Sequence, residues 1–173
     1  MTTLTLHSGS GLEVPTPERR PSLRLVPDDS THTIQAVVAD GNGLVRAGMR
    51  LLLEDQADVT VTGEAATGEE AIELARRMHP DVVLLDSALP GVSALEATRQ
   101  ILAQAPRGGV SVLMLSAGES GDSVLGALRA GVRGLLVKDS SPGELLRAVR
   151  VVARGDALLS PRLTGLLIES CVS

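Results

Sequence analysis

Runs of apolar residues recur along the chain, and several of them end on a polar side chain. Residues 82–85 are all apolar and lead directly into Asp86, where a turn follows. Other apolar runs end on Asp40, Ser116 and Lys138. Continuous apolar runs of this length are typical of strands in a parallel sheet that is covered on both faces. The pattern therefore predicts buried strands with polar groups at their carboxyl ends.

Segments with helical spacing of apolar residues separate these runs. We expect strands over residues 34–40, 59–64, 82–86, 110–116 and 134–138. Pairs of Ser or Thr with Glu three residues later, which cap helix N-termini, begin at Thr67, Ser93 and Ser141. The first helix is expected to bury one face made of Leu44, Val45, Gly48, Met49, Leu52 and Leu53.

Five strands that alternate with five helices predict an α/β fold with a parallel sheet. The expected strand order is the flavodoxin-like 2-1-3-4-5, which brings the polar strand ends to one edge. A leader over residues 1–32, rich in Pro, Ser and Thr, is expected to be disordered. The α/β domain should cover residues 33–155, and residues 156–173 should form a C-terminal helix or linker.

The composition narrows the classes of function. The 173-residue chain has a net charge of −5 and no aromatic residue, which argues against nucleic-acid binding by this chain itself. Its one cysteine, Cys171, gives no disulfide framework. No apolar run approaches the roughly 20 residues of a membrane span, so we expect a cytoplasmic protein without membrane contact. Lys138 is the only lysine.

The polar strand ends have the chemistry of a phosphoryl-acceptor site. A carboxylate such as Asp86 can attack phosphorus and form an acyl phosphate. Lys138 would place a positive charge beside one phosphate oxygen, and the Ser116 hydroxyl would donate to another. Asp40 and Asp86 would offer carboxylate ligands to Mg²⁺. A structural ion pair between Lys138 and Asp86 is the alternative interpretation.

Several short segments resemble a known family. They are, in chain order, Ala39–Asp40, Leu44–Gly48, Gly63–Ala71, Asp81–Asp86, Leu89–Gly91, Leu95–Arg99, Ala127–Gly131 and Leu136–Asp139. From about Thr33 to Gly155 the chain is similar to receiver domains of two-component response regulators. The similarity is to the NarL/FixJ type, which carries a LuxR-like DNA-binding domain.

The resemblance implies a fold and a set of roles. The fold would be a CheY-like (βα)5 three-layer sandwich. Asp86 would be the phosphoacceptor, and Ser116 and Lys138 would contact the phosphate. A magnesium ion would be held by Asp40, Asp86 and the backbone carbonyl of Ala88.

Three positions depart from the family pattern. Gly41 stands where the family has a second acid, so Mg²⁺ binding should be weakened. Leu135 stands at the switch position, where the family usually has an aromatic residue that moves inward on phosphorylation. Ala94 stands where a glycine is common. These departures indicate an atypical receiver with impaired or absent phosphorylation.

We interpret the chain as a regulatory module of a bacterial transcription regulator and not as an enzyme. In one hypothesis it dimerises without phosphorylation, with itself or with a related regulator, and DNA is contacted only by a C-terminal domain outside this chain. In the other, the Asp86 pocket accepts a phosphoryl group weakly or binds a small molecule. The sequence does not identify a histidine kinase. A dinucleotide site at residues 41–43 is disfavoured because Arg46 replaces the third glycine.

Overall fold

The computed structural model describes residues 32–118 and 120–172. The expected disordered leader lies outside the described residues except for His32. The elements are β1 (Ile34–Ala39), α1 (Gly43–Glu54), β2 (Val59–Ala65), α2 (Gly68–Met78), β3 (Val82–Asp86), α3 (Ala94–Gln104), β4 (Ser111–Ser116), α4 (Gly121–Ala130), β5 (Gly134–Val137), α5 (Pro142–Ala153), β6 (Leu158–Leu159) and α6 (Pro161–Val172). None of the described helices combines the length and apolar character that a bilayer span requires.

The strands form one parallel sheet in the order β2-β1-β3-β4-β5-β6. The predicted order of the first five strands is confirmed. The sixth strand was not predicted, because two residues are too few for a period-two pattern to be recognised. In the structure Leu158 and Leu159 extend the sheet by pairing with Gly134 and Leu135.

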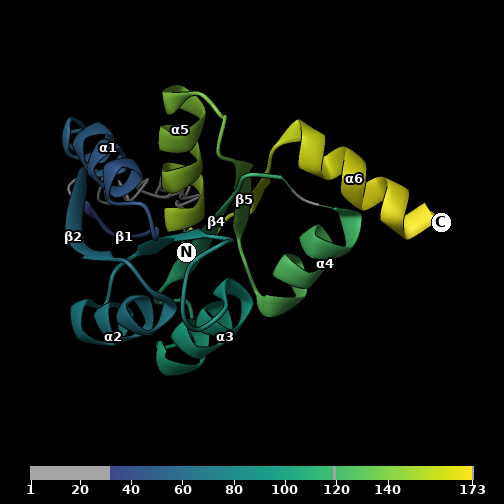
Figure 1. Cartoon of the computed structure of the whole chain (residues 1–173). Coiled ribbons are helices and arrows are strands. Elements are labelled where there is room, and N and C mark those ends of the chain that lie inside the picture. The colour runs from purple at the N-terminus through teal and green to yellow at the C-terminus, as the bar shows by residue number, and fades with distance from the viewer. Residues whose placement is uncertain (1–31, 119, 173) are drawn as a thin grey trace, which may run out of the picture. The chain divides into compact units, whose positions relative to one another are not determined.

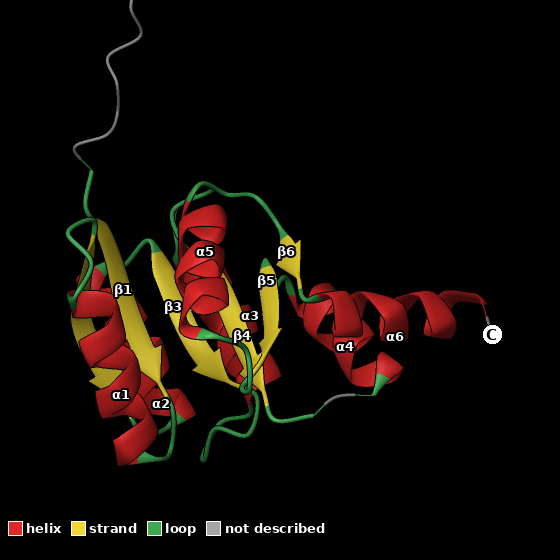
Figure 2. Ribbon diagram, turned by 90° about the horizontal axis from the view of Figure 1, so that it is seen from above, coloured by secondary structure: helices red, strands yellow, loops and turns green. Residues whose placement is uncertain are grey.

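Helices cover both faces of the sheet, as the apolar strands require. α1 and α5 lie on one face, and α2, α3 and α4 lie on the other (Figures 1 and 2). Alternate residues of β1 divide between the two cores: Ala36 and Val38 face α1 and α5, while Val37 and Ala39 face the opposite layer. The result is the three-layer sandwich that the sequence predicts.

Side-chain caps set the starts of the helices. Ser141 accepts a hydrogen bond from Glu144 N, and the Glu144 carboxylate accepts one from Ser141 N, so the predicted capping box of α5 is confirmed. Thr67 caps α2 in the predicted way, but the Glu70 carboxylate accepts from Ala66 N instead of Thr67 N. The return bond therefore lies one residue earlier than in the capping box expected from the sequence.

The predicted buried face of α1 is wrong in its first half. Met49 and Leu53 are buried, as expected, but Leu44 is 83% exposed. Val45 and Gly48 are exposed as well. The reason is that α1 carries apolar residues around much of its circumference, and the sheet covers only one side.

Candidate functional site

Four polar residues meet at the carboxyl edge of the sheet. Asp40 follows β1, Asp86 ends β3, Ser116 ends β4 and Lys138 follows β5. These four strands are neighbours in the sheet. Asp40, Asp86 and Ser116 are each at most 5% exposed. We call these four residues the strand-end cluster.

The Lys138 ammonium bridges the two carboxylates of the cluster. Its Nζ lies 2.8 Å from Asp40 Oδ2 and 3.0 Å from Asp86 Oδ1. Burial lowers the pKa of Lys138, but hydrogen bonds to Asp40 and Asp86 and their negative charges together raise it, so the net pKa lies above the ordinary value. Two anions share one cation, so the group keeps a net negative charge.

Backbone amides from the following turns orient both carboxylates. Asn42 N donates to Asp40 Oδ1 at 2.8 Å. Ala88 N donates to Asp86 Oδ1 at 3.1 Å. Hydrogen bonds to an ionised acceptor are stronger than neutral ones, so these amides hold the carboxylates in place before any ligand arrives.

Ser116 connects β4 to the segment that carries the lysine. Its carbonyl oxygen accepts a hydrogen bond from Lys138 N at 2.6 Å. Its Oγ accepts one from Gly118 N at 3.2 Å. The hydroxyl therefore belongs to the same edge as the ion group and also shapes the start of the loop towards α4.

The donors for a magnesium ion have suitable chemistry but form an incomplete set. Carboxylates of Asp40 and Asp86 and a carbonyl such as that of Ala88 are the oxygen donors that Mg²⁺ accepts. Over residues 32–118 and 120–172, no three His, Cys, Asp or Glu side chains group closely enough to hold a metal ion. Lys138 lies within ion-pair distance of both carboxylates and neutralises part of their charge.

The turn after β1 brings position 41 close to the ring of Pro90. A Cβ on Gly41 would lie 2.8 Å from Pro90 Cδ and 2.9 Å from Pro90 Cγ. A side chain at position 41 therefore requires the proline ring, or the loop that carries it, to move. From the sequence, Gly41 was only a missing ligand; the structure adds a close contact between the turn after β1 and the loop after β3.

Leu135, the residue at the predicted switch position, is a core residue. Its side chain is fully buried in the apolar layer that also contains Met114 and Val124. Its backbone carbonyl accepts a hydrogen bond from Ser160 N at 3.2 Å. The position thus contributes packing between β5 and the helices on that face.

Two supporting residues were not predicted from the sequence, and Arg46 of α1 is the first. Its Nη1 donates to the backbone carbonyl of Asp40 at 2.7 Å, and its Nε lies 3.9 Å from Glu64. Sequence reasoning used Arg46 only to exclude a dinucleotide site. The signal available was its position one turn into the helix that follows the first strand end.

Glu69, at the start of α2, is the second. Its Oε1 accepts a hydrogen bond from Val92 N at 3.1 Å, and Gly68 N donates to Pro90 O at 2.9 Å. The backbone amides of Glu69 itself and of Val92 hold the pKa of Glu69 below its usual value. These bonds fix the loop that follows Asp86. No periodicity in the sequence indicates such a contact across 23 residues.

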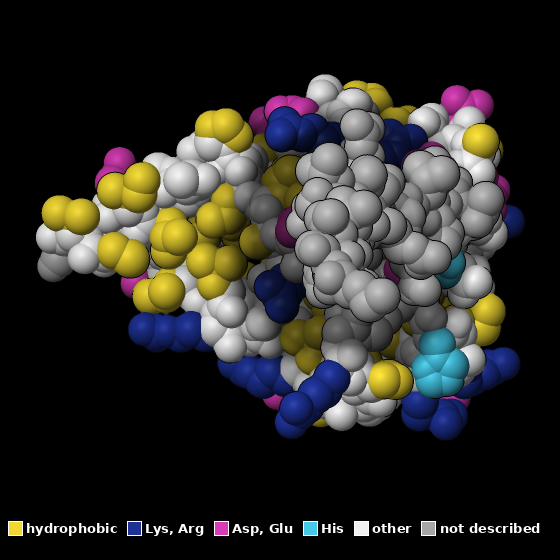
Figure 3. Space-filling view, turned by 180° about the vertical axis from the view of Figure 1, so that it is seen from behind, with side chains coloured by type: hydrophobic (Ala, Val, Ile, Leu, Met, Phe, Trp, Pro, Cys, Tyr) yellow, Lys and Arg dark blue, Asp and Glu magenta, His cyan; other side chains and the backbone are white. Residues whose placement is uncertain are grey.

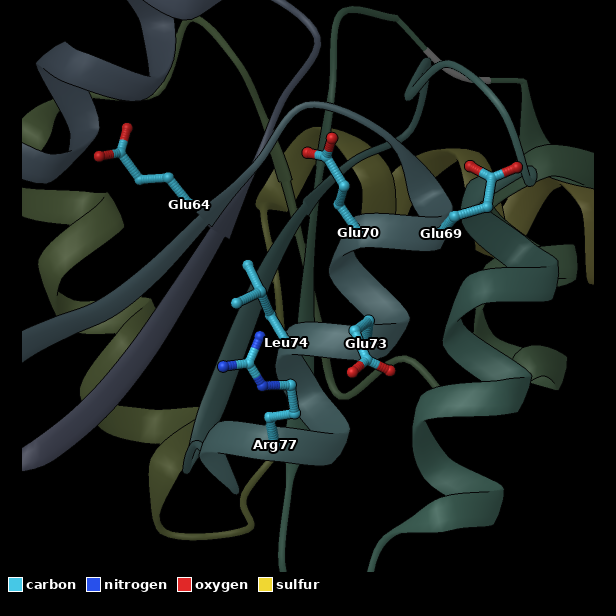
Figure 4. A pocket seen from close by; sticks show the side chains of 6 residues that line it. All are labelled: Glu64, Glu69, Glu70, Glu73, Leu74 and Arg77. Carbon is cyan, nitrogen blue, oxygen red and sulfur yellow. The ribbon is translucent and has the colours of Figure 1, made fainter.

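An open hollow of about 400 Å³ lies beside α2 and is lined by Glu64, Glu69, Glu70, Glu73, Leu74 and Arg77 (Figure 4). Its carboxylates already have partners within the fold. Glu64 pairs with Arg50, Glu73 pairs with Arg76, and the other two accept backbone amides. The hollow is therefore explained by structural contacts and does not compete with the strand-end cluster as a site.

The chain is similar to curated bacterial regulators. Residues 36–150 match the family described as the response regulator receiver domain. The chain is 38% identical over 125 residues to the uncharacterized transcriptional regulatory protein YxjL of Bacillus subtilis, which covers 72% of this chain and 56% of YxjL. It is 37% identical over 134 residues to the nitrate/nitrite response regulator protein NarL of Escherichia coli, a match that covers 78% of this chain and 61% of NarL. The chain thus spans less than two thirds of these relatives.

Solved structures show the same architecture. A LuxR-family two-component response regulator from Aurantimonas superposes with a TM-score of 0.75 and 33% identity, covering 82% of this chain and 99% of that chain. The signal receiver domain of the putative response regulator NarL from Mycobacterium tuberculosis superposes with a TM-score of 0.68 and 34% identity, covering 72% and 98%.

Proposed function

Because this chain belongs to the response regulator receiver domain family, we propose that it is the regulatory domain of a cytoplasmic transcriptional response regulator and that it works as an atypical receiver. In this proposal it controls an attached DNA-binding domain through dimerisation that does not require phosphorylation. The partner is a second copy or a related regulator. Contact with DNA belongs to a C-terminal domain outside this chain.

The contact between Gly41 and Pro90 carries this proposal. Phosphoryl transfer to a carboxylate concentrates negative charge that a divalent cation must balance. Position 41 supplies no carboxylate, and Pro90 lies where a side chain would have to enter. Losing one of the anionic ligands of a magnesium site lowers affinity substantially, because Mg²⁺ is bound through few carboxylates.

The second support is the ion pairing of Lys138 with Asp40 and Asp86. Lys138 contacts Asp40 and Asp86 at ion-pair distance. The ammonium therefore already satisfies the two acids as a structural group. Leu135, fully buried, has no aromatic ring with which to report a change at Asp86.

α1 offers a surface for a second copy. Leu44 is 83% exposed and Leu51 is 72% exposed. Beside them, between α1 and α5, lies a hollow of about 170 Å³ with an apolar lining that includes Met49 and Leu145 and reaches the stem of Lys138. A protruding leucine and an apolar hollow on one surface suit a two-fold interface, in which each copy fills the hollow of the other.

Charges on the same side of the sheet are also complementary. α1 ends with the exposed acids Glu54 and Asp55, while α5 presents Arg147 and Arg154 to solvent. A two-fold pairing that brings the end of α1 in one copy against α5 of the other would let these acids and bases interact. Such complementarity favours one orientation of the pair.

A second candidate function is a weak phosphoacceptor. It is favoured by one observation: Asp86, Ser116 and Lys138 all lie at one sheet edge, with the lysine in contact with the acceptor carboxylate. In this alternative, Mg²⁺ and a phosphoryl group bind at high concentration and stabilise a different arrangement of the loop after β3.

Beryllium fluoride, a phosphoryl mimic, separates the two candidates. The protein is titrated with beryllium fluoride and Mg²⁺ while its sedimentation is followed at several protein concentrations, with Asp86→Asn as the matched control. The proposal predicts a concentration-dependent dimer that is the same with and without the mimic and the same in Asp86→Asn. Saturable binding that is lost in Asp86→Asn and that increases dimerisation supports the phosphoacceptor instead. A monomer at all concentrations contradicts the dimerisation proposal.

A further inference from the structure

The C-terminal helix α6 lies against α4 and projects past the last strand of the sheet (Figures 1 and 2). Leu163 at its start is fully buried, and Leu166 and Leu167 pack partly against the core. Towards its end, Ile168 is 58% exposed and Val172 is 83% exposed. Figure 3 shows hydrophobic side chains gathered over this region of the surface. α6 is therefore an apolar helix that is only partly covered.

A glycine makes the contact between the two helices close. Gly121 is the first residue of α4, and a Cβ there would overlap Ser170 Oγ and lie 2.8 Å from the backbone carbonyl oxygen of Leu166. Gly126, one and a half turns further along α4, differs: its Cβ would meet only Leu95 Cδ1, at 3.7 Å. The absence of a side chain at Gly121 thus allows the backbone of α6 to approach α4 closely, whereas position 126 has room for a methyl group.

The joint at the start of α6 holds an unpaired polar group. Ser160 is 8% exposed, and its Oγ is the only buried side-chain oxygen or nitrogen without a hydrogen-bond partner in the described part of the chain. Its backbone is fully engaged, since Ser160 N donates to Leu135 O and Ser160 O accepts from Thr164 N. A serine before a helix normally caps it by accepting a backbone amide. The docked position of α6 therefore carries the cost of a buried unpaired hydroxyl.

Both elements that hold α6 lead directly to the strand-end cluster. α4 begins after the short loop that follows Ser116, and that loop is shaped by the bond from Gly118 N to Ser116 Oγ. β5, which holds the backbone of Ser160, continues into Lys138. A change in either element would act on the position of α6.

We propose that the α4 surface around Gly121 is a reversible docking surface for α6, the chain's own C-terminal helix, and that Ser160 is the joint at which α6 is released. In the docked state Leu166 and Leu167 are partly covered, and Ser160 Oγ is unpaired. In the released state the hydroxyl caps α6, and the apolar faces of α4 and α6 are free for a partner. The inference does not depend on whether Asp86 is phosphorylated.

Hydrogen exchange followed by mass spectrometry on the 173-residue chain tests this proposal. Gly121→Ala adds a methyl group that meets α6, so amides of residues 161–172 should exchange at least about tenfold faster. Gly126→Ala makes the same substitution on the same helix, and the exchange rates of the amides of residues 161–172 should stay within about twofold of those in the parent. Ser160→Ala removes the unpaired hydroxyl of the docked state and also removes the cap of the released helix. Both changes favour the docked state, so the exchange of these amides should slow by a factor of about three or more.

A variant on α6 guards against general unfolding in Gly121→Ala. Ser170→Leu places bulk against Gly121 from the surface helix, where it does not disturb the sheet, and it should accelerate exchange in α6 alone. Equal exchange in Gly121→Ala and Gly126→Ala overturns the proposal. So does unchanged exchange of α6 in Ser170→Leu, or faster exchange in Ser160→Ala.

Discussion

The ring of Pro90 occupies the space into which a side chain on Gly41 would extend, with Cδ 2.8 Å from the position of a Cβ. These residues lie in different loops, one after β1 and one after β3, and both loops border Asp40 and Asp86. The absence of an acid at position 41 and the position of the loop that carries Pro90 are therefore linked, because the proline ring lies where the acid's side chain would begin. We therefore expect that restoring the acid alone will not recreate a complete metal site.

This relationship gives the first prediction, on Gly41→Asp. Because the new side chain meets a rigid ring, the single variant should lose about 1–3 kcal/mol of stability and gain little Mg²⁺ affinity. The double variant Gly41→Asp/Pro90→Ala has both the carboxylate and the space, so its Mg²⁺ affinity should exceed that of the parent by about tenfold or more. Calorimetric titration with Mg²⁺ measures the metal affinity of the single and the double variant, with Pro90→Ala as the control. Equal affinities in the single and double variants would show that Pro90 is not the obstacle.

The second prediction concerns alkaline pH. The pKa of Lys138 is raised in the folded protein, so the stability it contributes is fully present below the ordinary value of 10.5 and is lost as the pH rises through the folded value. Since the chain has no tyrosine and no other lysine, few groups obscure this titration. Urea unfolding between pH 8 and about pH 12 should show the loss.

Lys138→Met provides the control for that experiment. At neutral pH this variant should be about 3 kcal/mol less stable than the parent, because Asp40 and Asp86 are left as buried carboxylates without a cation. It should also lack the alkaline loss. A parent and variant with the same alkaline profile would refute the assignment of that loss to Lys138.

The third prediction concerns the surface of α1. Leu51→Glu places a charge on an exposed apolar ridge, so it should weaken self-association by about tenfold or more without unfolding the domain. Ile168→Glu changes a similarly exposed apolar residue on α6 and should leave the dimer intact. Sedimentation velocity over a range of concentrations distinguishes them. Equal association of Leu51→Glu and the parent would exclude α1 as the interface.

The fourth prediction tests the anchor of the loop after β3. A Cβ on Gly68 would overlap the backbone carbonyl of Val92, so Gly68→Ala should cost about 2 kcal/mol. Gly126→Ala, in the open part of α4, should instead stabilise the protein by about 1 kcal/mol through helix propensity. Chemical unfolding of the two variants measures the contrast. Similar stabilities would contradict this prediction, because they would show that the backbone at Val92 moves aside at little cost.

Much of the fold could be predicted from the sequence, because strong local patterns agree with the global topology. The apolar run into Asp86 specifies a buried strand, and Ser93 and Ser141 mark helix starts that the structure confirms. Strand order then followed from the alternation of strands and helices. The same order brought Asp40 and Lys138 together, although they are 98 residues apart.

Other features depend on contacts that no local pattern records. The ring of Pro90 beside Gly41 depends on how two loops approach each other. The exposure of Leu44 depends on how much of α1 the sheet can cover, and a helix that is apolar around much of its circumference gives no sign of this. Arg46 and Glu69 act on backbone groups of neighbouring segments, and such bonds have no signature in sequence spacing.

The short strand β6 has a consequence for the behaviour of the protein in a crowded cell. It is the last strand of the sheet, has two residues, and is followed almost at once by Pro161. A long, regular edge strand offers a template for pairing with foreign chains, and short strands and proline are common protections against this. β6 thus gives the sheet a short edge beside β5 with few free backbone groups, which disfavours pairing with foreign chains.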